Sequence, residues 1–226
     1  MRYLHSHLHE PIFYSTSFTH NPKSITYTFS KKQSLEYALP SHSVFFSDSA
    51  FGNILPNRRS MQANCGLFNG AIFSWSTNVQ TCIAADSTDA EIQSLYSTIK
   101  RLVSYSHFIT SSNLCRATQF PVTLFAYNKP SINIILQNKI SPRSRHLDIP
   151  VTFSYEKLQQ KYFSLHHINT KLNAIDISTK ATSGPTVTRN WTFLRGTRNH
   201  PPSHTSHHHY LHSSNEAVAT LNSNKR

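Results

Sequence analysis

Acidic residues are scarce in this chain, so the positions where they occur are informative about its chemistry. The 226 residues include only 10 Asp and Glu. Asp48 directly follows an apolar run, Glu91 lies near the start of a helical pattern, and Asp176 lies in a short helical segment. Clustered carboxylates repel one another, and a bridging divalent cation relieves that repulsion. Three acids brought to one edge of a sheet would therefore predict two-metal phosphodiester chemistry, with Mg²⁺ as the cofactor.

Strands that could carry Asp48 are indicated by the first third of the chain. Residues 10–18 and 24–30 alternate between apolar and polar side chains, which predicts a hairpin. A compact strand is predicted over Val44–Ser47, so that Asp48 stands at its end. Residues 61–76 read as two further strands joined by an Asn-Gly dipeptide, the commonest tight-hairpin signal.

A long helix is predicted over Ser87–Ile109, where apolar residues recur with a period of 3.6. Ser87 or Thr88 is the expected N-cap, which places Glu91 in the first turn. The remaining predicted elements alternate between strand and helix: a strand ending at Tyr127, a helix opening at Pro130, a helix over 145–160 interrupted at Pro150, a strand over 162–168 and a short final helix over 170–180. Three antiparallel strands followed by alternating strands and helices predict an α/β fold with a mixed sheet and helices packed on it.

The charge balance narrows the class of partner. Lys and Arg number 22 against 10 acidic residues, for a formal charge of +12. Such a surface suits a polyanion such as nucleic acid, although a generic basic surface is an equal alternative. No run approaches the roughly 20 apolar residues that span a bilayer, and the three cysteines lack paired spacing. We therefore expect a soluble intracellular protein of the cytoplasm or nucleus, with no membrane partner and no small-molecule substrate.

Several stretches, taken in order, resemble the ribonuclease H (RNase H) domain of copia-type LTR retrotransposon Pol polyproteins. "FSDSAFGN" followed by "RRS" is similar to the family's Y-A-D-S-D-W-A-G and R-R-S-T, "FSWSTNVQ" to I-S-W-S-S-K-K-Q, and "DSTDAEI" to S-S-T-E-A-E-Y. Downstream, "RHLDI" is similar to K-H-I-D-I, and "INTKLNAIDISTK" to V-P-T-x-D-Q-L-A-D-I-L-T-K. The matched positions include Asp48, Gly52, Arg58, Arg59, Ser60, Trp75, Gln80, Ser87, Thr88, Ala90, Glu91, Asp176, Thr179 and Lys180.

The resemblance implies a ribonuclease H-like mixed five-stranded sheet with flanking helices, and a division of the chain. Residues 1–40 correspond to a remnant of the connection that follows the polymerase, and residues 41–182 to the RNase H-like domain. Residues 183–226 are expected to be a disordered, His-rich, low-complexity tail. Because the chain begins inside a motif that follows a polymerase, and lacks polymerase and integrase signatures, a degenerate fragment of a retrotransposon is expected.

The strand that ends at Tyr127 departs from the family pattern at a decisive position. In the family this strand runs into D-N-Q-S-A-I, and its Asp is a metal ligand, whereas the words here are "YNKPSI". The resemblance implies that Asp48, Glu91 and Asp176 hold Mg²⁺ and catalyse hydrolysis of the RNA strand of RNA·DNA hybrids. A phenol is neutral at pH 7 and offers one oxygen, so Tyr127 predicts a catalytically inactive domain.

Other positions are candidates for binding or structural roles. Arg58, Arg59, Arg143 and Arg145 are candidate phosphate contacts, and solvated loop charges are an equal alternative. Asp148 is expected to fix a loop, and Trp75 to be a core aromatic. Two alternatives to a crippled RNase H remain: a non-catalytic basic nucleic-acid-binding module and a translated remnant without function.

Overall fold

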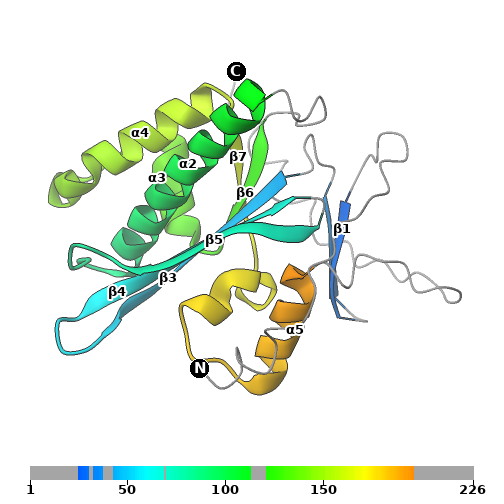
Figure 1. Cartoon of the computed structure of the whole chain (residues 1–226). Coiled ribbons are helices and arrows are strands. Elements are labelled where there is room, and N and C mark those ends of the chain that lie inside the picture. The colour runs from blue at the N-terminus through cyan, green and yellow to red at the C-terminus, as the bar shows by residue number, and fades with distance from the viewer. Residues whose placement is uncertain (1–24, 31–32, 38–42, 69, 113–120, 196–226) are drawn as a thin grey trace, which may run out of the picture.

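The structure is a computed structural model that describes residues 25–30, 33–37, 43–68, 70–112 and 121–195 (Figure 1). Its strands are β1 Ile25–Ser30, β2 Gln33–Tyr37, β3 Ser43–Ile54, β4 Arg59–Phe68, β5 Ala71–Val79, β6 Val122–Ala126 and β7 Phe163–His167. Its α-helices are α2 Ser87–Ser112, α3 Lys129–Gln137, α4 Asp148–Gln159 and α5 Gly184–Leu194. Short 3₁₀ helices are η1 Pro142–Leu147, η2 Thr170–Leu172 and η3 Ala174–Ser178.

The main sheet has five strands in the order β5-β4-β3-β6-β7. β3 pairs antiparallel with β4, β4 pairs antiparallel with β5, and β6 pairs parallel with both β3 and β7. Helices α2, α3 and α4 cover one face, whereas η3 and α5 lie against the other (Figure 1). The predicted mixed five-stranded sheet with flanking helices is therefore confirmed. β3 is the central strand, and it carries Asp48.

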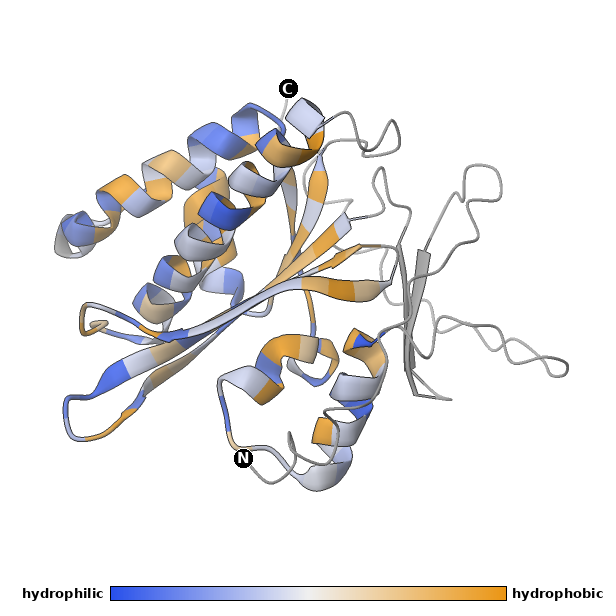
Figure 2. Ribbon diagram, viewed as in Figure 1, coloured by the Kyte–Doolittle hydropathy of each residue, from blue (hydrophilic) through white to orange (hydrophobic). Residues whose placement is uncertain are grey.

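Each face of β3 contributes to a different part of the core. Val44 and Phe46 pack with Phe193 and Leu194 on the α5 side, whereas Phe45 packs with Leu95 and its neighbours under α2. This division follows from the two-residue period of a strand. Figure 2 shows hydrophobic residues along β6 and the neighbouring strands, between the helices of the two faces. A strand covered on both sides reads as a continuous apolar run, which is why 44–46 was readily predicted as a strand.

The predicted end of the strand at Asp48 is wrong. β3 continues to Ile54, so Asp48 lies within the strand and pairs with Ala63 of β4. The predicted core position of Trp75 is also wrong, because its side chain is 65% exposed. It lies on the edge strand β5 and pairs with Cys65. The hairpin over residues 61–76 is confirmed.

The predicted starts of two helices need correction. Asp86, rather than Ser87 or Thr88, caps α2, because its Oδ1 accepts a hydrogen bond from the N–H of Asp89 at 2.8 Å. Glu91 therefore lies beyond the first turn. Pro150 does not interrupt its helix, because α4 begins at Asp148 and Pro150 therefore lies in the first turn. The backbone N–H groups of the first turn have no partner within the helix, so proline loses no hydrogen bond there.

The ends of the chain also differ from expectation. The strand predicted over residues 24–30 is present as β1, but it pairs with β2, and residues 10–18 lie outside the described residues. The short helix predicted over 170–180 is two 3₁₀ segments. The predicted tail begins too early, because α5 buries Phe193 and Leu194 in the core. Residues 196–226, which hold the His-rich stretch, lie outside the described residues.

Among the described helices, none has the length and apolar character needed to cross a membrane. Cys65 and Cys82 are both free thiols, and Cys65 is buried in the core. Burial raises the pKa of the Cys65 thiol, which therefore stays protonated. Cys115 lies outside the described residues.

Candidate functional site

Asp48 is fully buried in the middle of the sheet, on the face that η3 covers. Its Oδ1 accepts a hydrogen bond from Asn173 Nδ2 at 3.3 Å, and its Oδ2 accepts one from Thr179 Oγ1. Burial raises the pKa of the Asp48 carboxyl to about 6, and the charge of Lys180 and the hydroxyl of Thr179 oppose that rise. Asp48 is thus a buried acid whose two oxygens both meet donors from the η2–η3 region.

Glu91 approaches the same point from the other face of the sheet. Its Oε1 accepts hydrogen bonds from the backbone N–H of Ser49 at 3.1 Å and from Ser49 Oγ at 2.6 Å. Burial is the main cause that raises the pKa of Glu91 to about 8, and the charge of Asp48 adds to it. Its second oxygen, Oε2, is buried and has no hydrogen-bond partner within the described residues.

Tyr127 lies close to these acids, because the charges of Glu91, Asp48 and Asp176 all act on its hydroxyl. It follows β6 directly, and the next residue, Asn128, caps α3 by accepting a hydrogen bond from the N–H of Ser131 at 2.8 Å. The phenol is half-buried, and burial together with the charges of Glu91 and Asp48 raises its pKa above the ordinary value of 10.0. Tyr127 therefore contributes a neutral hydroxyl, as expected, in the middle of the acid cluster.

Lys180 joins Asp176 to Asp48. Its Nζ lies 2.5 Å from Asp176 Oδ1 and 3.5 Å from Asp48 Oδ2. The same ammonium lies 5.1 Å from the centre of the Tyr127 ring. Burial alone would lower the pKa of Lys180, but the two carboxylates outweigh burial and raise it. The cluster therefore contains a permanent positive charge.

A ladder of small polar side chains ties α2 to β3 and so positions Glu91. Ser94 Oγ donates to the carbonyl of Asp48 at 2.7 Å and lies 3.0 Å from Ser47 Oγ. Thr98 Oγ1 donates to Ser47 Oγ at 3.1 Å. Because buried hydroxyls must find partners, this ladder sets how α2 lies on the sheet.

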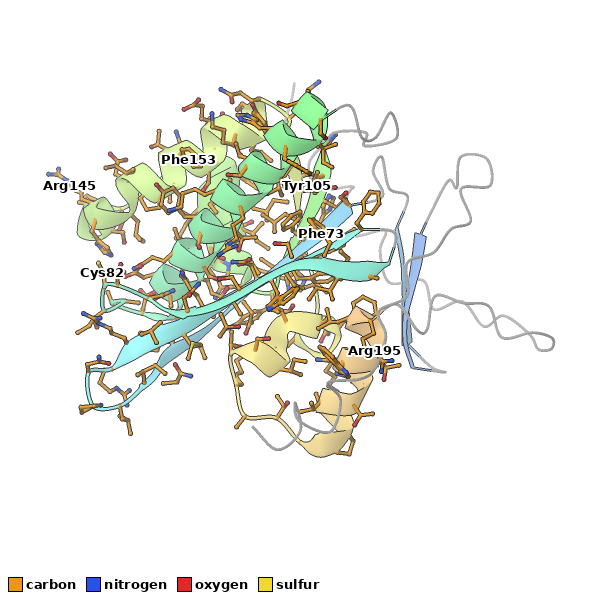
Figure 3. The ribbon with its side chains drawn as sticks, in the orientation of Figure 1. Phe73, Cys82, Tyr105, Arg145, Phe153 and Arg195 are labelled. Carbon is orange, nitrogen blue, oxygen red and sulfur yellow. The ribbon has the colours of Figure 1, made fainter. Side chains whose placement is uncertain are left out.

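The four positions predicted for the site, Asp48, Glu91, Tyr127 and Asp176, therefore lie together. Their role in metal binding stays a prediction. Among the described side chains, those of Arg58, Arg59 and Arg145 are not partners of these acids. Arg58 lies in the turn between β3 and β4, and Arg59 is the first residue of β4. Arg145 lies in η1 and points away from the body of the molecule (Figure 3). Arg143 also belongs to η1, and its side chain lies outside the described part of the structure.

A different acid from the one expected fixes the loop before α4. Asp148 is exposed in the first turn of α4. Asp89, in contrast, is buried, accepts a hydrogen bond from the N–H of Ala85 at 2.8 Å, and meets His146 Nε2 at 3.0 Å. This contact joins η1, with its arginines, to the start of α2.

The arrangement does not fit a two-metal site as it stands. Among the described residues, no three Asp, Glu, His or Cys side chains are placed to hold one metal ion. Lys180 Nζ forms ion pairs with one oxygen of Asp48 and one oxygen of Asp176, which a metal ion would otherwise bind. Tyr127 supplies a phenol where a carboxylate is needed. Magnesium prefers several hard oxygen ligands in a strict octahedral geometry.

Sequence reasoning missed four residues that complete the cluster: Ser49, Asn173, Thr179 and Lys180. Thr179 and Lys180 were matched to a motif without a role. The spacing of Asp176 and Lys180, four residues apart, was a usable signal for an ion pair on one helical face. Ser49 and Asn173 gave no comparable signal, because their partners are distant in the chain.

No family model matches the chain. A retrovirus-related Pol polyprotein from transposon TNT 1-94 of Nicotiana tabacum is 22% identical over 135 residues, which make up 60% of this chain and 10% of that polyprotein. A Ty1-ER2 Gag-Pol polyprotein of Saccharomyces cerevisiae is 26% identical over 140 residues, or 61% of this chain and 8% of that polyprotein. The chain is a relative of retrotransposon Pol polyproteins.

This Pol relative spans about a tenth of the length of the curated proteins it matches. Among solved structures, LC11-RNase H1 in complex with an RNA/DNA hybrid is 14% identical to it. That match covers 61% of this chain and 92% of the other, with a TM-score of 0.43. The predicted relationship to retrotransposon Pol polyproteins is confirmed.

Proposed function

We propose that this Pol-related chain is an RNase H-like domain that binds nucleic acid, RNA·DNA hybrids above all, without hydrolysing the RNA strand. The observation that carries this proposal is Tyr127 in the middle of the acid cluster. Its pKa is raised rather than lowered, so the phenol does not supply the anionic oxygen of a carboxylate. Two-metal hydrolysis depends on carboxylates that hold both ions against the scissile phosphate.

Nucleic-acid binding is supported by the positive charge of the chain and not by the acid cluster. The chain carries a formal charge of +12, and Arg58 and Arg145 are exposed. Neutralising phosphates releases counterions, so affinity for a hybrid should fall steeply as salt rises. Contacts to phosphates position a duplex without reading its sequence, and an A-like hybrid offers its 2′-hydroxyl groups in a wide minor groove.

The test is a nuclease assay on a hybrid with a labelled RNA strand, in the presence of Mg²⁺. The wild type is expected to leave the RNA intact while it retards the hybrid in a gel. Cleavage by the wild type that disappears in Asp48→Asn would overturn the proposal. Tyr127→Asp restores the missing carboxylate, and Tyr127→Asn is its neutral control of the same size. Cleavage that appears only in Tyr127→Asp identifies the phenol as the cause of inactivity.

A further inference from the structure

Among the described residues, Lys180 is the only cation that forms ion pairs with the site acids Asp48 and Asp176. Its Nζ contacts Asp176 Oδ1 at 2.5 Å and Asp48 Oδ2 at 3.5 Å. The lysine side chain is 34% exposed, Asp176 is 16% exposed and Asp48 is fully buried. One ammonium thus sits between two carboxylates, with its outer side toward solvent.

Neighbouring side chains hold the lysine and its segment in this position. The ring of Tyr127 lies 5.1 Å from the ammonium, a distance at which the ring face attracts a cation. Thr179 Oγ1 and Asn173 Nδ2 donate to the two oxygens of Asp48. The segment from Asn173 to Lys180 is therefore anchored on the acids of the sheet.

The cluster also contains two buried oxygens that are left without a partner in the described part of the chain. Glu91 Oε2 and Asn173 Oδ1 are buried, and neither has a hydrogen-bond partner within the described residues. Both residues are fully buried and reach Asp48 or its neighbour Ser49 through their other atoms. Asn173 Oδ1 is thus a buried acceptor that the cluster's own donors leave unsatisfied.

An ammonium and a divalent ion cannot use these oxygens together. Mg²⁺ bound between Asp48 and Asp176 would need the oxygens that Lys180 contacts, and two positive charges a few ångströms apart repel strongly in a partly buried site. Moving the lysine away also breaks its own contact with Asp48 on the sheet. Binding of the metal and docking of Lys180 are therefore alternatives.

We propose that Lys180 is the built-in cation of this cluster and that it competes with Mg²⁺ for Asp48 and Asp176. The lysine stabilises the fold without a metal and lowers the affinity of the site for one. This role rests on the proposed function, because a site that holds no metal leaves Asp48 and Asp176 for Lys180 to contact. Its test measures thermal stability and Mg²⁺ binding, so a failure of this proposal can be told apart from a failure of the proposed function in the nuclease assay.

The experiment compares wild type with Lys180→Met, Lys180→Arg and the control Lys171→Met, which removes an exposed lysine of the neighbouring η2. Melting temperature is followed by circular dichroism in EDTA and in about 10 mM Mg²⁺, and Mg²⁺ binding by calorimetry. Magnesium is the probe because the chain has 15 histidines, which bind transition metals but not this hard ion. Removing one partner of a partly buried pair should lower the melting temperature of Lys180→Met by about 5 °C in EDTA.

Mg²⁺ should then raise the melting temperature of Lys180→Met by about 4 °C, with binding at least about tenfold tighter than in wild type. Wild type, Lys180→Arg and Lys171→Met should show no comparable response. An equal Mg²⁺ response in wild type, or none in a folded Lys180→Met, overturns the proposal. If Lys180→Met folds only with Mg²⁺, the proposal is supported. If it folds under neither condition, Asp48→Asn/Lys180→Met must fold, because it removes the uncompensated charge, and its failure also overturns the proposal.

Discussion

The buried acid Glu91 makes a quantitative prediction about stability. Burial holds its pKa at about 8, well above the ordinary value of 4.5 that applies in the unfolded chain. A group whose pKa is raised by folding contributes stability that is fully present below the lower value and is lost as the pH rises through the higher one. The wild type should therefore lose stability between about pH 4.5 and pH 8.

The size of this loss follows from the gap between the two pKa values. Each tenfold change in acid strength corresponds to about 1.4 kcal/mol, so the gap sets an upper limit of about 5 kcal/mol. About 3 kcal/mol of it falls between pH 5 and pH 8. Glu91→Gln removes the titration but keeps an oxygen that accepts from Ser49. At pH 8 the variant should be more stable than wild type by about 4 kcal/mol, and at pH 5 by less than about 1 kcal/mol.

Urea unfolding followed by circular dichroism at several pH values measures both free energies of unfolding. Glu156→Gln is the matched control, because Glu156 is an exposed glutamate and its replacement leaves the cluster intact. The control should follow the wild-type pH dependence. If the stability difference between wild type and Glu91→Gln does not change between pH 5 and pH 8, Glu91 is not the buried, uncharged acid described above.

Three further substitutions test the fold around the site, each by urea unfolding. Phe193→Ala should cost about 3–5 kcal/mol, because the ring is fully buried and meets Phe46 edge-on; a neutral effect would show that α5 does not belong to the domain. Gly66→Ala should cost about 1–3 kcal/mol, because a Cβ there would lie 2.8 Å from a ring carbon of Phe45 that has no room to move; wild-type stability would contradict this close approach. Ser94→Ala should cost about 1–3 kcal/mol through the lost bond to the carbonyl of Asp48, and no loss would mean that the polar ladder is not needed.

Local patterns in the sequence were sufficient for most elements of the sheet. The apolar run at 44–46, the Asn-Gly turn and the helical period from Ser87 each report on interactions close in the chain. β3 was predicted too short because polar residues follow Phe46. Those residues are buried polar groups, and Ser49 finds its partner in Glu91, 42 residues away. No local pattern contains that information.

The end of the domain was missed for a related reason. The helix α5 opens with Gly184 and Pro185 and carries few apolar residues, so its composition resembles that of a tail. Proline in the first turn is a helix-start signal, and it was available in the sequence. The burial of Phe193 depends on the opposite face of β3, which only the three-dimensional fold reveals.

The candidate site was located by the resemblance to a family and not by spacing. Asp48, Glu91 and Asp176 are separated by 43 or more positions in the chain, and only the family motifs linked them. The charge that compensates them, Lys180, was visible as a basic residue four positions after Asp176. Its second contact, with Asp48, could not be anticipated, because it depends on where η3 docks on the sheet.

The most direct measurement of the central claim follows one RNA·DNA hybrid in a single reaction with Mg²⁺, scoring both the bound fraction and the integrity of the RNA strand. Salt-sensitive binding with intact RNA, unchanged when EDTA replaces Mg²⁺, is the predicted result. RNA fragments that form only with Mg²⁺, and that vanish when Asp48 is replaced by Asn, would contradict it.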